Sequence, residues 1–198
     1  MLVSLGFLAP GLDAAVIISD NFDGYPAVPS GGLILYTSPI SFGAWNVTAG
    51  SVDLLNNYPG LPCHSGTQCL DMDGSTNAAG TITTNFSYTA GVTYALSFWY
   101  AGNQRNANAD TMNVTLGGQS TQLIVPYLTA WTQGTLVFTP ATNGTGALTF
   151  AHLGSDNQGI LLDDVTLQSR GGAAPIPEPA TWAMMAGGLM LAGLLRRR

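Results

Sequence analysis

The chain has 198 residues, of which only 8% are charged, and its formal net charge at pH 7 is −6. It contains no lysine and five arginines, three of which form the C-terminus, so Arg105 and Arg170 are the only basic side chains in its body besides histidine. Proteins that bind nucleic acid need lysine and arginine to replace phosphate counterions. We therefore exclude nucleic acid as a partner and expect a charge-poor body followed by a chemically different tail.

The first fifteen residues, MLVSLGFLAPGLDAA, form an apolar segment that ends in small residues. This is the pattern of the apolar centre and cleavage region of a secretory signal peptide. The segment has no basic start, and Asp13 lies close to the expected cut after Ala15, so an N-terminal β-strand is the alternative. We expect a signal-peptide-like segment at 1–15 and an exported protein.

Two cysteines, Cys63 and Cys69, lie in a loop with the sequence LPCHSGTQCLDMDG. In an oxidising compartment such a pair forms a disulfide, and closing so short a loop stabilises the fold by about 2 kcal/mol. A zinc site that uses His64 is the alternative, but no fourth ligand lies nearby. We predict a Cys63–Cys69 disulfide.

Residues 16–169 carry the pattern of β-strands and almost none of the pattern of helices. From Val92 to Tyr100, large apolar residues alternate with small or polar ones, which is typical of a half-buried strand. Similar short segments recur at intervals of about ten residues, separated by Gly, Asn and Ser turns. The later ones are 112–116, 123–125, 136–138, 148–150 and 161–167. We expect an all-β, jelly-roll sandwich of about eight to ten strands.

The two ends of this body carry the motifs NFDGYP at 21–26 and ILLDDVTL at 160–167. They resemble the jelly-roll, galactose-binding-like modules that are common among carbohydrate-binding modules. In the closing motif, alternation would turn Asp163 toward the core together with Leu161 and Val165, where a carboxylate needs hydrogen-bond donors or a metal. The resemblance implies that Asp163 anchors the N-terminal strand, in some modules through a structural calcium, for which Asp23 is the natural partner. Satisfaction of Asp163 by backbone amides is the alternative.

Catalytic residues are scarce in this sequence. The only glutamate, Glu178, lies in the tail, and neither histidine, His64 or His152, has a recognisable triad setting. The segment 71–75, DMDGS, contains part of an EF-hand pattern, but Ile82 stands where the bidentate glutamate would be, so we expect a turn there. We expect no enzyme activity and no cofactor other than structural calcium.

Aromatic residues offer a binding function instead. Trp99 lies on the strand face opposite Tyr94 and Phe98, so it points outward if those two residues are core. Together with Trp131 it can supply rings that stack on a sugar. Packing of these rings between layers is the alternative.

The tail, residues 170–198, has three parts in a fixed order. A Pro- and Gly-rich linker (170–179) contains Pro177, Glu178 and Pro179, and an apolar stretch follows from Ala180, Thr181 and Trp182 to Leu195. The chain then ends in three basic residues, which are Arg196, Arg197 and Arg198. A helix over 180–195 has no polar face and would reach roughly 24 Å, so it suits a membrane with snorkelling arginines that stay on the cytoplasmic side.

This order, with P-E-P-A-T-W at 177–182, resembles the PEP-CTERM sorting signal of Gram-negative bacteria. The resemblance implies that an exosortase, a membrane-embedded cysteine protease, recognises the tail and cleaves near the Pro-Glu-Pro motif. It also implies an association with exopolysaccharide production. A plain C-terminal membrane anchor over 180–198 is the alternative.

The sequence therefore predicts an exported, non-catalytic protein of the cell surface or exopolysaccharide matrix. Its expected partners are an exosortase, the inner membrane before cleavage, and exopolysaccharide. A carbohydrate-binding module is the alternative function, and a glycoside hydrolase is a third that requires a cleft with paired carboxylates.

Overall fold

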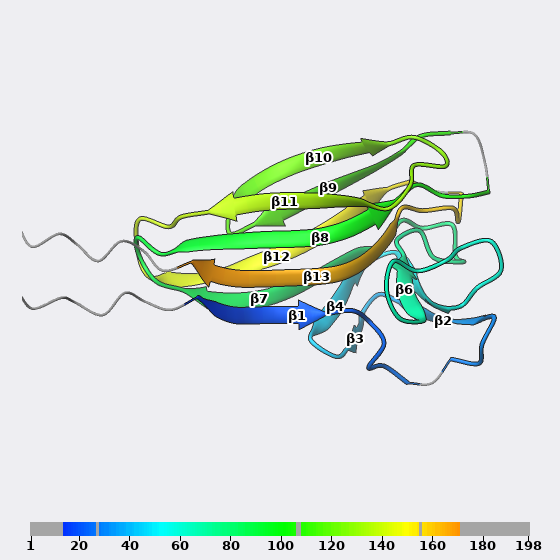
Figure 1. Ribbon diagram of the computed structural model, residues 1–198, viewed down its shortest axis with the longest axis horizontal. Coiled ribbons are helices and arrows are strands. Elements are labelled where there is room, and N and C mark those ends of the chain that lie inside the picture. Colours follow the sequence, from blue (N-terminus) through cyan, green and yellow to red (C-terminus); the bar gives the residue numbers. More distant parts are fainter. Residues whose placement is uncertain (1–13, 27, 106–107, 155, 171–198) are drawn as a thin grey trace, which may run out of the picture. The chain divides into compact units, whose positions relative to one another are not determined.

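The computed structural model describes residues 14–26, 28–105, 108–154 and 156–170, which form one all-β unit without a helix in those ranges (Figure 1). Its strands are β1 (Ala15–Asp20), β2 (Gly32–Thr37), β3 (Ile40–Phe42), β4 (Trp45–Ala49), β5 (Ser51–Asn56), β6 (Gln68–Asp71), β7 (Thr81–Tyr88), β8 (Thr93–Ala101), β9 (Asp110–Leu116), β10 (Gln119–Val125), β11 (Thr132–Phe138), β12 (Gly144–Leu153) and β13 (Leu161–Arg170).

The strands form two packed sheets, and Figure 1 shows one sheet in front of the other. The seven-stranded sheet has the order β11-β8-β13-β6-β5-β2, with β1 also paired to β13. The six-stranded sheet has the order β10-β9-β12-β7-β4-β3, and every ladder in both sheets is antiparallel. The predicted all-β sandwich is therefore confirmed.

The number of strands exceeds the expected eight to ten, because the described residues contain thirteen. The additional strands lie mainly between residues 32 and 71. There β6 (QCLD) does not alternate polar and apolar residues, β5 does so only over 51–54, and β3 is only three residues long. A strand without alternation gives no period-two signal.

The core lies between the two sheets, where Trp45, Phe22, Phe98 and Phe150 are completely or almost completely buried. A second, smaller apolar cluster lies on the outer side of the seven-stranded sheet. It consists of Leu55, Leu61, Cys69, Ala101 and Leu161, with Trp131 packed against it. The outer face of the seven-stranded sheet is thus partly covered by the loops that contain Leu61 and Trp131.

The closing strand β13 departs from the predicted alternation. Leu162 and Val165 face the inner core, whereas Leu161 belongs to the outer cluster, and the register shifts between Asp163 and Thr166. This β-bulge inserts one extra residue, Asp164, at a φ of 46°, and so reverses which residues face inward. The expectation that Leu161, Asp163 and Val165 share the core face was therefore wrong.

Several expectations fall on other residues. The signal-peptide-like segment, the Pro-Glu-Pro motif, the apolar stretch from Ala180 and the terminal arginines lie, except for Ala14 and Ala15, outside the described residues. Within the described ranges, no helix is long and apolar enough to cross a membrane.

Candidate functional site

The loop between β5 and β6, residues 57–67, lies on the outer side of the seven-stranded sheet and is closed by a disulfide. Cys63 and Cys69 are bonded to each other, with their Cα atoms 5.4 Å apart. The predicted disulfide is confirmed. It ties the loop to β6, the strand to which Cys69 belongs.

Two carboxylates that are distant in sequence hold this loop. Asp163 Oδ2 accepts hydrogen bonds from the backbone N–H groups of His64 and Ser65, each at 3.0 Å. Asp23 Oδ1 accepts hydrogen bonds from the N–H groups of Thr67 at 2.8 Å and Gln68 at 2.9 Å. The opening and closing motifs of the chain therefore meet at the disulfide loop.

Gly66 shows how closely the loop fits against Asp23. A Cβ atom at Gly66 would lie 1.7 Å from Asp23 Oδ2, and the residue has a φ of +54°. Only glycine meets both conditions without strain. Glycine is thus required at position 66 both by the contact with Asp23 and by the backbone conformation of the turn.

These contacts do not fit a calcium ion shared by Asp23 and Asp163. Asp163 Oδ1 also accepts the Asp164 N–H, and Asp23 Oδ2 accepts the Asn21 side-chain amide. The partners of both carboxylates are N–H donors, which cannot act as ligands to a cation, and the described residues contain no group of three or more metal-ligating side chains suitably placed. Calcium at these two residues stays a prediction that the contacts do not support.

Asp163 is completely buried beneath the loop. Burial raises the pKa of its carboxyl to about 6, although the N–H groups of Ser65, Asp164 and His64 favour the ionised form. Next to it, Asp164 is partly exposed and binds His64 Nδ1 at 2.5 Å and the Ser65 hydroxyl at 2.8 Å. The two aspartates thus fix both the backbone and the side chains of the loop.

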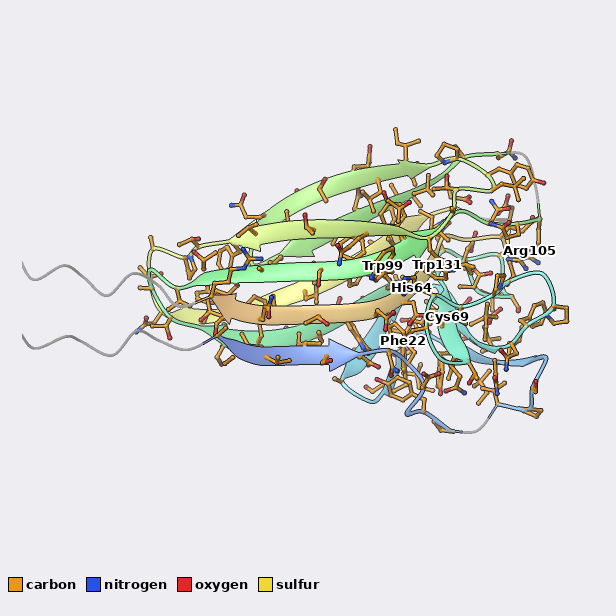
Figure 2. The ribbon with its side chains drawn as sticks, in the orientation of Figure 1. Phe22, His64, Cys69, Trp99, Arg105 and Trp131 are labelled. Carbon is orange, nitrogen blue, oxygen red and sulfur yellow. A yellow bond between two sulfur atoms is a disulfide. The ribbon has the colours of Figure 1, made fainter. Side chains whose placement is uncertain are left out.

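This arrangement places His64 between the two tryptophans that were predicted to bind sugar (Figure 2). The His64 ring stacks on Trp99, with ring centroids 3.9 Å apart and an interplanar angle of 15°. It meets Trp131 edge to face at 5.6 Å. Trp99 does point outward, as predicted, but His64 covers its ring, so Trp99 and Trp131 do not line one open groove.

Trp131 itself lines a hollow with a volume of about 270 Å³. Its indole N–H donates to the Pro62 carbonyl at 3.1 Å, which fixes the ring against the disulfide loop. The lining combines apolar and polar side chains, and it consists of Pro62, Ala101, Gln104, Leu128, Thr129, Ala130, Trp131 and Leu161.

Two loops shape this hollow. The Gly102 N–H donates to the Thr129 carbonyl, and the Leu128 N–H donates to the Asn103 carbonyl, so the loops after β8 and β10 are bonded together. A Cβ at Gly102 would lie 2.3 Å from the Pro126 carbonyl oxygen. Leu128 has a φ of 60°, a left-handed conformation that a bulky residue rarely adopts, and its side chain is 53% exposed.

Sequence reasoning missed most of this lining. Three loops supply four of the lining residues, which are Pro62, Gln104, Leu128 and Thr129. No spacing in the sequence predicts that these loops lie next to one another. His64 was weighed as a zinc ligand or a triad base, whereas it covers Trp99.

A second cluster of titratable groups lies where the strands of both sheets end. His152 is 2% exposed and lies between Asp73, at 4.0 Å from Nδ1, and Asp110, at 3.9 Å from Nε2. Burial lowers the pKa of His152 and raises that of Asp110. Asp73 and His152 are as buried as the core, so this group is not the open cleft with paired carboxylates that a glycoside hydrolase requires.

The segment 71–75 forms the predicted turn. Asp71 Oδ1 accepts the N–H groups of Asp73 and Gly159, and its other oxygen accepts the Arg105 guanidinium. The Ser75 N–H and hydroxyl both donate to Asp53. These carboxylates hold loops together, and burial raises the pKa of Asp71 to about 7 despite the opposing effect of Arg105.

The two sheets form a jelly-roll β-sandwich, and the solved structures with a similar fold include carbohydrate-binding and adhesin modules. The sequence itself matches no model of a known protein family and no curated protein. Similarity is therefore visible only at the level of the fold.

Three solved structures illustrate it. The K1 cleaved adhesin domain of Lys-gingipain from Porphyromonas gingivalis is 15% identical, with 79% of this chain and 100% of that chain covered and a TM-score of 0.52. The tandem CBM22-1-CBM22-2 domain of Xyn10C from Paenibacillus barcinonensis is 15% identical, with 86% and 50% covered and a TM-score of 0.52. TmCBM61, solved with β-1,4-galactotriose, is 19% identical, with 64% and 89% covered and a TM-score of 0.50. At these identities the likeness shows the fold alone.

Proposed function

We propose that this chain is a carbohydrate-binding module, and that the hollow beside Trp131 holds a sugar unit of a neutral polysaccharide. The observation that carries the proposal is a fixed indole ring on the wall of a 270 Å³ hollow that also presents Gln104 and Thr129. Sugars combine apolar C–H faces with hydroxyl edges, so they fit a site with one ring and a few directional polar groups. The jelly-roll fold, which the chain shares with TmCBM61, supports the same class of function.

The site suits a neutral ligand better than an anionic one. Among the residues that line the hollow, none is charged. The nearest described guanidinium, Arg105, is paired with the buried Asp71. An acidic polymer would therefore find no free cation here and would meet a chain with a net charge of −6.

Affinity gel electrophoresis with a panel of neutral polysaccharides that includes β-1,4-galactan tests this proposal. We expect at least one of them to retard the full-length chain, and Trp131→Ala to weaken that binding about tenfold or more, as truncation of a stacking ring does. Tyr127→Ala is the matched control, because Tyr127 is an exposed ring on the same loop that does not line the hollow. Equal retardation of wild type and Trp131→Ala would overturn this site.

We also propose, as the setting of this function, that the protein is exported and processed at its tail. The motif at 177–182 and the terminal arginines motivate this reading, and a disulfide between Cys63 and Cys69 fits an oxidising compartment. The mature protein would then lie at the surface or in the exopolysaccharide matrix of a Gram-negative bacterium.

Intact mass and fractionation of the mature protein, from cells with and without a working exosortase, test the processing. We expect the residues after the Pro-Glu-Pro motif to be lost only where the enzyme works. A tail retained in both strains would mean a simple membrane anchor.

A further inference from the structure

The outer face of the six-stranded sheet carries an unbroken row of hydroxyl and amide side chains across all six strands. Cross-strand pairing places each member directly opposite the next. In order from β3 to β10 the row is Ser41, Asn46, Thr83, Thr149, Thr115 and Ser120. At about 4.8 Å between strands, the row is roughly 24 Å long.

The row does not stand alone. A second row on the same face, two residues along each strand, consists of Thr81, Ala151, Asn113 and Gln122. Beyond it, Leu153 and Ile124 flank Thr111 on either side, and these two aliphatic side chains are 52% and 69% exposed. The hydroxyl row, a second row that is mainly amide, and two exposed aliphatic side chains thus lie side by side on this face.

The face is also free of charge. In these six strands, all of which the structure describes, the only Asp, Glu, Lys, Arg or His residues are Asp110 and His152, and both are buried between the sheets. Solvent-facing sheets usually carry charged side chains, which keep them soluble and prevent association. A polar, uncharged surface of this size is therefore suited to a polar, uncharged ligand.

A hollow adjoins one end of the row. Its volume is about 720 Å³, and Ser41 and Asn46 contribute to its lining together with Pro39, Ile40, Val47 and Thr48. The Ser41 hydroxyl donates to Asn46 Oδ1 at 2.6 Å, so the Asn46 amide group is oriented at the edge of the hollow. A long ligand on the row would continue into this space.

We propose that this face, the hydroxyl row with its adjoining hollow, binds an extended chain of a neutral polysaccharide laid across the strands. The inference shares only its class of ligand with the proposed function, because the Trp131 hollow lies on the other sheet. Hydroxyl and amide groups at regular spacing match a polymer of sugar hydroxyls, and Leu153 and Ile124 match its C–H faces.

Charge and polarity favour this occupant over others. Nucleic acid or an anionic polymer would need basic side chains, which these strands lack. A second copy of the chain packed face to face would bury the hydroxyl rows in an interface whose core is normally apolar. A neutral polysaccharide can hydrogen-bond to every member of the row.

The triple variant Thr83→Val, Thr149→Val and Thr115→Val tests the proposal, because it removes three adjacent hydroxyls and keeps their branched shape and strand preference. Affinity electrophoresis of the full-length chain in gels with long neutral polysaccharides, including β-1,4-galactan, gives the readout. We expect at least tenfold weaker binding. The matched control is Thr135→Val, an exposed threonine on β11 in the other sheet, and we expect it to bind as wild type does.

The outcomes separate the two binding proposals. Binding lost in the triple variant and kept in Trp131→Ala supports the sheet face and overturns the Trp131 hollow. Binding lost in Trp131→Ala and unchanged in the triple variant overturns the sheet face and leaves the hollow. Failure of every neutral polysaccharide to retard the wild type overturns both.

Sedimentation equilibrium checks the other occupant, and urea unfolding checks that the triple variant is folded. A wild-type dimer that the triple variant dissociates would overturn the proposal in favour of an interface between copies. If the triple variant is unstable, Thr149→Val alone replaces it, with an expected weakening of roughly threefold, in line with the loss of one hydrogen bond.

Discussion

The two outer faces of the sandwich differ in what lies over them. On the seven-stranded sheet, the 57–67 loop covers Trp99 with His64 and buries Asp163 completely. On the six-stranded sheet, Thr83, Thr149 and their neighbours in the hydroxyl row stay partly exposed. The strands differ as well, because β8 and β13 present Trp99, Asp163 and Asp164 to the loop, whereas β7, β9 and β12 present mainly Thr and Asn.

The two faces also differ in their ionisable groups. The covered face contains ionisable groups, and each is tied to donors, since a buried carboxylate without donors is costly. The outward-facing strand residues of the open face include none, and its hydroxyl and amide groups bond mainly to one another, as Ser41 does to Asn46 and Thr83 to Thr149. We therefore expect substitutions at the carboxylates that hold the 57–67 loop to change stability, and substitutions in the hydroxyl row of the open face to change binding.

The largest effect is expected for Asp163→Ala. This variant leaves the N–H groups of His64, Ser65 and Asp164 without their acceptor beneath the loop. Unsatisfied buried donors cost about 1 to 3 kcal/mol each, and with partial relaxation we expect a loss of about 3 kcal/mol in the free energy of unfolding. Urea unfolding of the oxidised protein measures it.

Asp164→Asn is the matched control. Asp164 is partly exposed, and asparagine tolerates its positive φ. We expect a loss of no more than about 1 kcal/mol. If Asp163→Ala and Asp164→Asn lower the free energy of unfolding by the same amount, the burial of Asp163 does not account for the stability of the covered face.

The second effect concerns the disulfide. Replacing both Cys63 and Cys69 by Ser frees the loop, and we expect a loss of about 2 kcal/mol in the free energy of unfolding. Because His64 would no longer be held over Trp99, the emission of Trp99 should also shift to longer wavelength in the folded state. Unchanged fluorescence would show that Asp163 and Asp23 hold the loop without the disulfide.

The sequence predicted the covered face only in part. The disulfide, the outward direction of Trp99 and the alternation of β8 all followed from local patterns. The bulge at Asp164 could not be predicted in this way, because the local sequence LLDDV contains no signal for an inserted residue. That single residue moved Asp163 from the core to the outer face and replaced its expected neighbours with the amides of a distant loop.

The open face was harder to recognise for a different reason. Thr83, Thr149 and Thr115 are 66 and 34 residues apart along the chain, and only the register of β7, β12 and β9 brings them into one row. Register depends on which strands pair, and a single sequence does not give that pairing. The hollow beside Trp131 has the same cause, since three loops form it.

A smaller and gradual effect is expected with pH. The pKa of Asp163 is raised to about 6 in the folded protein, above its unfolded value of about 3.9. The folded state therefore binds this proton more tightly, so its contribution to stability is fully present below pH 4 and is lost as pH rises through 6. We expect the free energy of unfolding of wild type, compared with Asp163→Asn, to rise as pH falls from about 7.5 to 5.

The measurement is the difference between the two urea midpoints at each pH. This difference isolates Asp163 from Asp71, whose pKa is also raised, and from His152, whose pKa is shifted in the opposite direction. A difference that stays flat between pH 5 and 7.5 would mean that the amide donors hold Asp163 ionised throughout.

The smallest effect is expected where a hydroxyl is removed from the open face. Thr149 Oγ1 lies 3.1 Å from Thr83 Oγ1, and both groups can turn to water, so Thr149→Val should change the free energy of unfolding by less than about 0.5 kcal/mol. Ser65→Ala removes a hydroxyl of the same chemistry from the covered face, where it donates to Asp164 Oδ1 at 2.8 Å. There we expect about 1 kcal/mol, because a partly buried acceptor loses its donor. Paired urea titrations compare the two, and a larger loss for Thr149→Val would mean that the open face is held by its own hydroxyl contacts and is less available to a ligand than we propose.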